Sequence, residues 1–494
     1  MSKYQSVIGL EIHSELKTQS KMFCDCLNQS EAREPNINVC PICSGHPGTL
    51  PVINKKAVEL VIKAGLALNC TIAKSAKFDR KNYFYPDLPK GYQISQYDLP
   101  LALGGWLEIN GKKIRLTRIH LEEDAGKLVH PKGANPKGVK HSLVDFNRAG
   151  VPLMELVTEP DISSGAEAGQ FCEELQLILR YLEISEANME NGQMRCEVNI
   201  SLKPENGKKG EKLGTKVEIK NLNSFRAVRR AVDYEIKRQS DLLESGHKVA
   251  HETRGWDEDK QKTFSQRSKE QAQDYRYFPE PDLPPLNDLA EMSGELAREI
   301  PELPLAKRER FAEEYKLPAS DVATLTASKG LADYFEQVVS ELDTWLKIKS
   351  IENKDKLVKL TANYLLTELQ KLMLSRKVGI NKCQISPENF AEFITMIEQK
   401  EISSSAAQAV LKEMFETGAD PSHIVEDKQL TQVSGKDELN KIVKKVIGEN
   451  QKSVNDYKAG KANALQFLVG QAMKASQGKA NPEVVSEILI EMLG

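Results

Sequence analysis

The segment Val7-Ile8-Gly9-Leu10-Glu11-Ile12-His13 alternates apolar and polar residues. A period of two predicts a β-strand with one aliphatic face, and it places Glu11 and His13 together on the opposite face. A carboxylate and an imidazole on one strand face can share a metal ion or a proton, or they can simply face solvent. This strand is the starting point for a sheet with one buried face and one polar face.

Other predicted strands near this part of the chain also carry polar residues. Arg195, Glu197 and Asn199 alternate with apolar residues, and the adjacent acids Glu122 and Glu123 end another strand. Adjacent carboxylates repel each other unless a turn leaves them in solvent or a divalent cation neutralises them. Several polar strand faces in one domain indicate a lined cavity, and its oxygen ligands favour Mg²⁺ and phosphoryl chemistry.

Positive charge and aromatic rings occur together at Arg80, Lys81, Tyr83 and Lys90. This mixture suits a phosphate and a stacked base, whereas its structural alternative is a surface turn with salt bridges. The sequence has no P-loop and no dinucleotide-binding glycine motif, so neither of these would hold a nucleotide. It also has no GxSxG or HExxH motif, and therefore offers no evident acyl-transfer nucleophile.

Four of the eight cysteines form two close pairs, Cys24 with Cys26 and Cys40 with Cys43. No N-terminal signal pattern and no run of about 20 apolar residues is present, so we expect a cytoplasmic protein with reduced thiols and no membrane partner. Two close pairs in a reduced compartment predict a structural zinc site. The alternative is four unrelated buried cysteines.

The 494 residues predict several domains. Strand and turn patterns mix with helices in the first part, and helical periodicity dominates after about residue 300. Ser386-Pro387 and Asn481-Pro482 are typical helix starts. We therefore predict an α+β fold with a mixed sheet at 1–294, an all-helical domain at 295–404 and a second helical domain at 405–494.

The net charge of −3 means that any RNA contact must come from a local basic patch. The one clear patch lies between residues 441 and 479, with eight lysines against two acids. Lys444, Lys445 and Lys461 are our candidate contacts to a phosphate backbone. The alternative is a solvated lysine face.

Long, unusual strings of this sequence resemble one known family, the B subunits of aspartyl/glutamyl-tRNA amidotransferases (the GatB family). The resemblance covers essentially the full length of the chain. The strings that carry it lie at 7–13, 77–87, 121–127, 143–153, 220–225, 274–282 and 467–474.

The resemblance implies a catalytic protein that works in a heterotrimer with two partners, an amidase and a smaller protein. The amidase partner releases ammonia from glutamine. The GatB protein binds misacylated tRNA(Gln) or tRNA(Asn), phosphorylates the side-chain carboxylate of the attached Glu or Asp with ATP, and lets ammonia displace the phosphate. The resemblance also implies an N-terminal cradle domain, a helical domain and a YqeY-like helical tail that contacts tRNA.

By position, Glu11, His13, Glu122 and Glu123 fall where the family gathers Mg²⁺. Glu197 stands where the family pattern commonly has Asp, and its longer side chain leaves metal coordination open to either a direct or a water-mediated contact. All five are candidate catalytic residues.

Lys81 and Lys90 complete the candidate catalytic set, and Lys90 lies where the family's ammonia path is expected to begin. Arg80, Lys81 and Tyr83 are the candidate ATP contacts. The paired cysteines occur in only part of the family, so the zinc prediction depends on their spacing alone.

Two other functions remain open from the residues. A zinc-containing tRNA-binding scaffold without catalysis would explain the cysteines and the lysines, but not the carboxylates. A free-standing metal-dependent kinase of a small carboxylic acid would act without RNA. The sequence also leaves open whether Glu-tRNA(Gln), Asp-tRNA(Asn) or both are substrates.

Overall fold

The computed structural model describes residues 3–129, 142–204, 213–268, 274–349, 353–430, 436–461, 463–476 and 479–494. The chain divides into two units, Met1–Leu303 and Pro304–Gly494. The first unit mixes strands and helices, and the described part of the second contains only helices, which confirms the predicted fold class. None of the described helices combines the length and the apolar character needed to cross a membrane.

A ten-stranded mixed sheet forms the centre of the first unit, with β12 and β13 as its parallel pair. Its strand order is β14 (Lys262–Ser268), β13 (Glu252–Asp257), β12 (Val217–Leu222), β11 (Met194–Pro204), β1 (Tyr4–Glu15), β10 (Pro152–Thr158), β7 (Lys112–Glu123), β5 (Ala102–Leu103) and β2 (Thr71–Ile72), and β6 (Trp106–Ile109) also pairs with β7. The predicted first strand, β1, is therefore central.

Two small sheets accompany the large one. The first consists of β15 (Phe278–Pro279), β3 (Asp79–Asn82) and β4 (Tyr92–Ser95), and the second of β8 (Lys127–Val129) and β9 (Leu143–Asp145). The three-stranded sheet joins residues from two distant parts of the sequence, because β15 pairs with β3.

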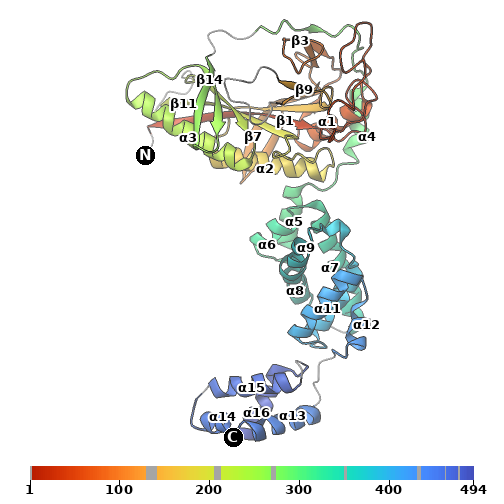
Figure 1. The fold of residues 1–494 in the computed structure, drawn as a ribbon, viewed down its shortest axis with the longest axis vertical. Helices are drawn as coiled ribbons and strands as arrows, with labels where there is room; N and C mark the ends of the chain where they lie inside the picture. Colours follow the sequence, from red (N-terminus) through yellow and green to blue (C-terminus); the bar gives the residue numbers. More distant parts are fainter. Residues whose placement is uncertain are drawn as a thin grey trace. The chain divides into compact units, whose positions relative to one another are not determined.

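Helices cover one face of the large sheet, where α2 (Gly165–Tyr181) and α3 (Phe225–Glu244) run side by side (Figure 1). Ser164 and Ser224 cap these two helices by accepting hydrogen bonds from backbone N–H groups. Ile8, Leu10 and Ile12 of β1 are at most 1% exposed in the core that these helices share. The alternate residues of β1 consequently lie on the uncovered face.

The first unit also contains α1 (Lys55–Ala67), which packs against β7, and α4 (Leu289–Ala297), which packs against α1. Leu289 and Leu296 of α4 belong to the same apolar core as the sheet. The first unit therefore extends through α4, somewhat beyond the predicted limit at residue 294.

The described residues of the second unit form two separate apolar cores. The helices of the first core are α5 (Pro304–Tyr315), α6 (Ala319–Leu325), α7 (Lys329–Lys349), α8 (Lys354–Tyr364), α9 (Gln370–Arg376), α10 (Pro387–Glu398), α11 (Ser404–Thr417) and α12 (Pro421–Asp427). Those of the other core are α13 (Lys436–Glu449), α14 (Gln451–Lys458), α15 (Asn463–Ala475) and α16 (Pro482–Leu493).

Both predicted helix starts are confirmed. Ser386 caps α10 and Asn481 caps α16, in each case with proline in the first turn. The division predicted near residue 404 does not coincide with a change of core. Ile402 and Ala406 are buried in one core, and the described part of the next core begins at Leu439.

Candidate active site

The uncovered face of the large sheet lines a cavity of about 520 Å³. Most of its walls are polar side chains from the central strands and from β3, β4 and the segment before β15. The lining residues are Glu11, His13, Lys81, Tyr83, Gln93, Ser95, Gln96, Tyr97, Arg118, His120, Glu122, Asp124, Ala125, Leu153, Glu155, Arg195, Glu197, Glu218, Lys220, Tyr275 and Tyr277.

One group of metal-capable side chains arises directly from strand pairing. Glu155 of β10 lies opposite His13 of β1 and also opposite His120 of β7. Its Oε2 is 3.3 Å from His13 Nε2 and 3.2 Å from His120 Nε2, while Glu122 Oε1 is 3.7 Å from His13 Nε2. His13, Glu122 and Glu155 offer ligand atoms within 4.8 Å of one another, and sequence reasoning missed Glu155 and His120.

The charges of this group support one another. Burial acts to lower the pKa of His13, but the hydrogen bond and charge of Glu155 outweigh it and raise this pKa. Burial acts to raise the pKa of Glu155, but His120 and His13 hold it well below its usual range. The pKa of Glu122 is also lowered, against the effect of burial, through its hydrogen bond with His120. Both carboxylates are therefore available as anionic oxygen ligands.

A second group consists of Glu11, Glu197 and Glu218, whose ligand atoms also lie within 4.8 Å of one another. Glu11 and Glu197 are direct cross-strand neighbours on β1 and β11. Like charges in such a pair destabilise a sheet unless a cation compensates them. Lys220 supplies one, because its Nζ is 2.8 Å from Glu197 Oε2 and 3.4 Å from Glu218 Oε1.

Lys81 differs from the other lysine and the arginines that line this cavity, each of which forms an ion pair with a described carboxylate. Among the described residues, no carboxylate lies within ion-pair distance of its Nζ, which instead lies 5.1 Å from the ring centre of Tyr275 and 5.9 Å from that of Tyr83. Tyr97 and Tyr277 stack with their ring centres 4.3 Å apart. An ammonium beside aromatic rings is the combination that the sequence suggested for a phosphate and a base.

Glu123 and Lys90 are not brought into this cavity. Successive residues of a strand face opposite sides, so Glu122 lines the cavity while Glu123 points away from it. The buried Glu123 carboxylate pairs with the Lys90 ammonium and accepts a hydrogen bond from Ile94 N at 2.9 Å. In the sequence Glu122 and Glu123 resemble one cluster, because a run of acids hides the alternation of the strand.

Arg80 is separated from Lys81 for the same reason. Its Nε and Nη2 donate to Glu280 at 2.7 and 2.8 Å, and its guanidinium lies 4.3 Å from the ring centre of Tyr92. Of the three predicted ATP contacts, Lys81 and Tyr83 line the cavity and Arg80 does not.

The four predicted zinc ligands lie together in the first unit. The sulfur atoms of Cys24, Cys26, Cys40 and Cys43 are within 4.8 Å of one another, and those of Cys40 and Cys43 are 3.9 Å apart. Tetrahedral zinc with Zn–S distances of about 2.3 Å places sulfur atoms about 3.8 Å apart. Lys21 Nζ lies 3.8 Å from Cys43 Sγ and favours its thiolate. This cluster can hold a zinc ion.

The three lysines proposed to contact tRNA are exposed on the surface around the last apolar core. Lys444 and Lys445 lie on α13, and Lys461 follows α14. Lys445 is 4.0 Å from Glu449 and Lys461 is 2.9 Å from Asp456. Exposed pairs of this kind contribute little to stability, so these lysines remain available to a polyanion.

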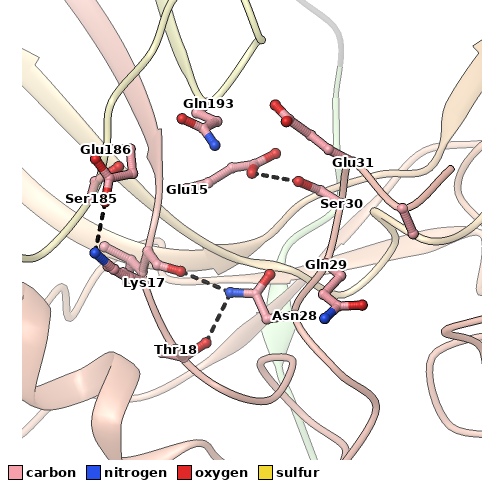
Figure 2. Close-up of a pocket in the computed structure, with 12 residues that line it drawn as sticks. Glu15, Lys17, Thr18, Asn28, Gln29, Ser30, Glu31, Ser185, Glu186 and Gln193 are labelled. Carbon is pink, nitrogen blue, oxygen red and sulfur yellow. Dashed lines mark hydrogen bonds and ion pairs between the residues drawn. The ribbon is translucent and has the colours of Figure 1, made fainter. Parts of the chain in front are cut away.

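A second cavity, of about 350 Å³, lies at the end of β1. Figure 2 shows Glu15 beside Ser30, whose hydroxyl donates to the Glu15 carboxylate at 2.9 Å. Burial and the charge of Asp124 raise the pKa of Glu15 to about 7. Glu15 continues the face of β1 that carries Glu11 and His13, although sequence analysis did not select it.

Comparison with known families identifies the class of this protein. Residues 6–292 match the model of the GatB/GatE catalytic domain, and residues 347–493 match that of the GatB domain. The first match spans the sheet and both groups of carboxylates.

Similar full-length proteins agree with this assignment. The chain is 51% identical to the B subunit of the aspartyl/glutamyl-tRNA(Asn/Gln) amidotransferase of Thermoanaerobacter pseudethanolicus, over 99% of both chains. It is 49% identical to the protein of the same name from Carboxydothermus hydrogenoformans and 48% identical to that from Dehalococcoides mccartyi, over 100% of this chain and 99% of each relative. The chain therefore belongs to the GatB family, whose members are subunits of ligases.

Proposed function

We propose that this chain activates and amidates the side-chain carboxylate of Glu-tRNA(Gln), Asp-tRNA(Asn) or both. One observation carries the proposal. A single cavity holds both clusters of carboxylates and the ammonium of Lys81, which forms no ion pair with any described carboxylate. Such a cavity suits phosphoryl transfer, which requires positioning and charge neutralisation more than a protein nucleophile. In this reaction ATP transfers its terminal phosphoryl group to the carboxylate and leaves as ADP.

His13, Glu122 and Glu155 are the residues that would hold Mg²⁺. Carboxylate oxygens suit this ion, and His13 would join them as the neutral imidazole. Its Nε2 lies 3.7 Å from Glu122 Oε1 and 3.3 Å from Glu155 Oε2, which is compatible with ligand distances of about 2.1 Å. The chemistry that a bound Mg²⁺ supplies is neutralisation of charge on the transferring phosphoryl group. Glu11, Glu197 and Glu218 form a second candidate group, in which Lys220 already provides one positive charge.

Lys81 and Tyr83 are the proposed ATP contacts. The Lys81 ammonium can pair with phosphate oxygens because none of the described carboxylates engages it, and the neighbouring tyrosine rings offer flat surfaces to a base. The sheet and the β3–β4 segment form two walls of this cavity, and exclusion of water by the bound substrates would protect the activated carboxylate from hydrolysis.

Ammonia then attacks the carbonyl carbon of the acyl phosphate, phosphate leaves, and the nitrogen loses a proton to give the amide. We assign the release of ammonia from glutamine to a partner. We propose a heterotrimer with an amidase and a small third protein, consistent with relatives that are named as subunits.

Two further parts of the chain support this role. The four clustered cysteines are proposed to bind a structural zinc ion that ties two loops together, since a closed site of four thiolates leaves no open position for catalysis. The exposed lysines of the last core are proposed to hold the tRNA backbone.

The test is amide formation on misacylated tRNA by the assembled complex, with ammonium chloride replacing glutamine so that the partner's chemistry is bypassed. We expect ATP-dependent amide formation that falls at least ~100-fold in Glu155→Gln, because one charge of the metal group is lost. Wild-type rates in this variant would exclude the proposed site, and ATP-independent amidation would exclude carboxylate activation.

A further inference from the structure

Gln96 is a buried amide with one end fixed by the protein and the other end without a partner. It follows β4, is 2% exposed and lines the cavity. Its Oε1 accepts hydrogen bonds from Leu121 N at 3.1 Å and from Leu101 N at 3.3 Å. Among the described residues, nothing accepts a hydrogen bond from its Nε2.

The two backbone donors determine the orientation of this amide. Turning it over would place the NH₂ group against two N–H groups, so the oxygen must face the backbone and the nitrogen must be the free end. A buried donor without an acceptor destabilises a fold, and most buried polar groups in proteins are paired. The unpaired nitrogen therefore requires an explanation.

Neighbouring side chains on the same segment differ from Gln96 in this respect. Gln93 Nε2 donates to the backbone oxygen of Glu123 at 2.8 Å, and Ser95 Oγ donates to Glu122 Oε2 at 3.0 Å. The donor group of each therefore has a partner within the protein, although both side chains also line the cavity. Of these three side chains, only Gln96 has a donor group with no partner at all among the described residues.

We propose that Gln96 Nε2 donates a hydrogen bond to an anionic oxygen of the bound substrate. The inference rests on the proposed function and deepens it. Gln96 is anchored to Leu121, which stands between His120 and Glu122 in β7, and Gln96 lines the same cavity as these two neighbours. The acceptor is an oxygen of the reacting end, either of the ATP phosphates or of the aminoacyl carboxylate.

The test uses the assembled complex with Gln96→Glu and Gln96→Met. Glutamate keeps an oxygen for the two backbone N–H groups and replaces the donor with a second acceptor, whereas methionine removes the donor without adding charge. Hydrogen bonds to charged groups support an expected loss of about 10- to 100-fold in kcat/KM for amide formation. If the acceptor is a phosphate, kcat/KM should fall when ATP is the varied substrate. If the acceptor is the aminoacyl carboxylate, kcat/KM should fall when misacylated tRNA is the varied substrate.

Gln239→Met is the matched control. Gln239 is a fully buried glutamine of α3 outside the cavity, and its Oε1 also lacks a partner among the described residues. We expect this variant to lower thermal stability and to leave both kcat/KM values unchanged. Glutaminase activity of the partner without tRNA checks that each complex has assembled.

The inference is overturned if Gln96→Met keeps both kcat/KM values within about twofold of wild type, whether or not its melting temperature falls. Such a result would mean that the amide is structural or that a water occupies its donor. If the proposed function itself is wrong, the result differs, because Glu122→Gln and Glu155→Gln then also form the amide at wild-type rates.

Discussion

Glu122 and Glu123 are adjacent in sequence but face opposite sides of β7, so replacing each by glutamine tests the geometry of the site. Glu122 belongs to the group with His13 and Glu155, whereas Glu123 pairs with Lys90. We expect Glu122→Gln to raise the Mg²⁺ concentration for half-maximal amide formation at least ~10-fold, because a charged ligand is lost. The same concentration should stay within about twofold in Glu123→Gln.

The free energy of unfolding should fall more in Glu123→Gln than in Glu122→Gln. The Glu123 carboxylate is 3% exposed and its partner Lys90 is also largely buried. Removing one partner of a buried ion pair costs about 3–5 kcal/mol, and we expect the lower end because glutamine can still accept from Ile94 N. Glu122→Gln keeps an acceptor for Ser95 and relieves repulsion with Glu155, but it also loses the attraction of the carboxylate to His13 and His120. Its cost should therefore be about 1–2 kcal/mol, below that of Glu123→Gln.

The measurements are urea unfolding of each variant without Mg²⁺ and Mg²⁺ titrations of amide formation by the complex. Each variant serves as the control for the other, since the two substitutions are chemically identical and one residue apart. An equal increase in Mg²⁺ requirement, together with unchanged stability of Glu123→Gln, would refute the assignment of the two faces.

Three other predictions test separate parts of the chain. Purified protein should contain about one zinc ion, and Cys40→Ser should lose it and lower the unfolding midpoint of the first unit; zinc-free protein of unchanged stability would contradict this. Glu197→Asp should keep kcat/KM within about threefold, because it shortens a ligand without removing its charge, and a loss beyond ~100-fold would show that carboxylate reach is critical. Replacing Lys444, Lys445 and Lys461 together by alanine should flatten the salt dependence of tRNA binding by about one unit of slope per lost phosphate contact, whereas an unchanged slope would mean a solvated lysine face.

Local patterns predicted the elements of the fold better than its domain boundaries. The alternation around Glu11 and the serine and asparagine caps depend on neighbouring residues, and the structure confirms them. The predicted domain boundary at 404/405 falls within the serine run at 403–405. In the structure Ser403 caps α11 by accepting from Ala406 N, and the apolar core continues through it. The same residue types serve caps and linkers, so only packing distinguishes the two.

Residues of the candidate site were predictable where their pattern lay within a single strand. Glu11 and His13 were found because they alternate with aliphatic residues in β1. Glu123 was grouped with Glu122 because an acidic run hides the period of two. Glu155 is the single charged residue of β10, and its proposed role depends on pairing with β1 and β7 across the sheet. The register between these strands cannot be deduced from local sequence. A lone charged residue in an apolar stretch was nevertheless a signal that could have drawn attention to Glu155.

The register of β1 also sets the relation between the two carboxylate groups. Glu11 belongs to one group and His13 to the other, and two residues along a strand rise about 6.6 Å. One strand therefore fixes their separation, while its two neighbours, β10 and β11, supply Glu155 and Glu197 at the paired positions. A slip of β1 by one residue would turn Glu11 and His13 into the core and away from these partners. The aliphatic face of β1, held under α2 and α3, thus determines the geometry of the cavity as well as the stability of the sheet.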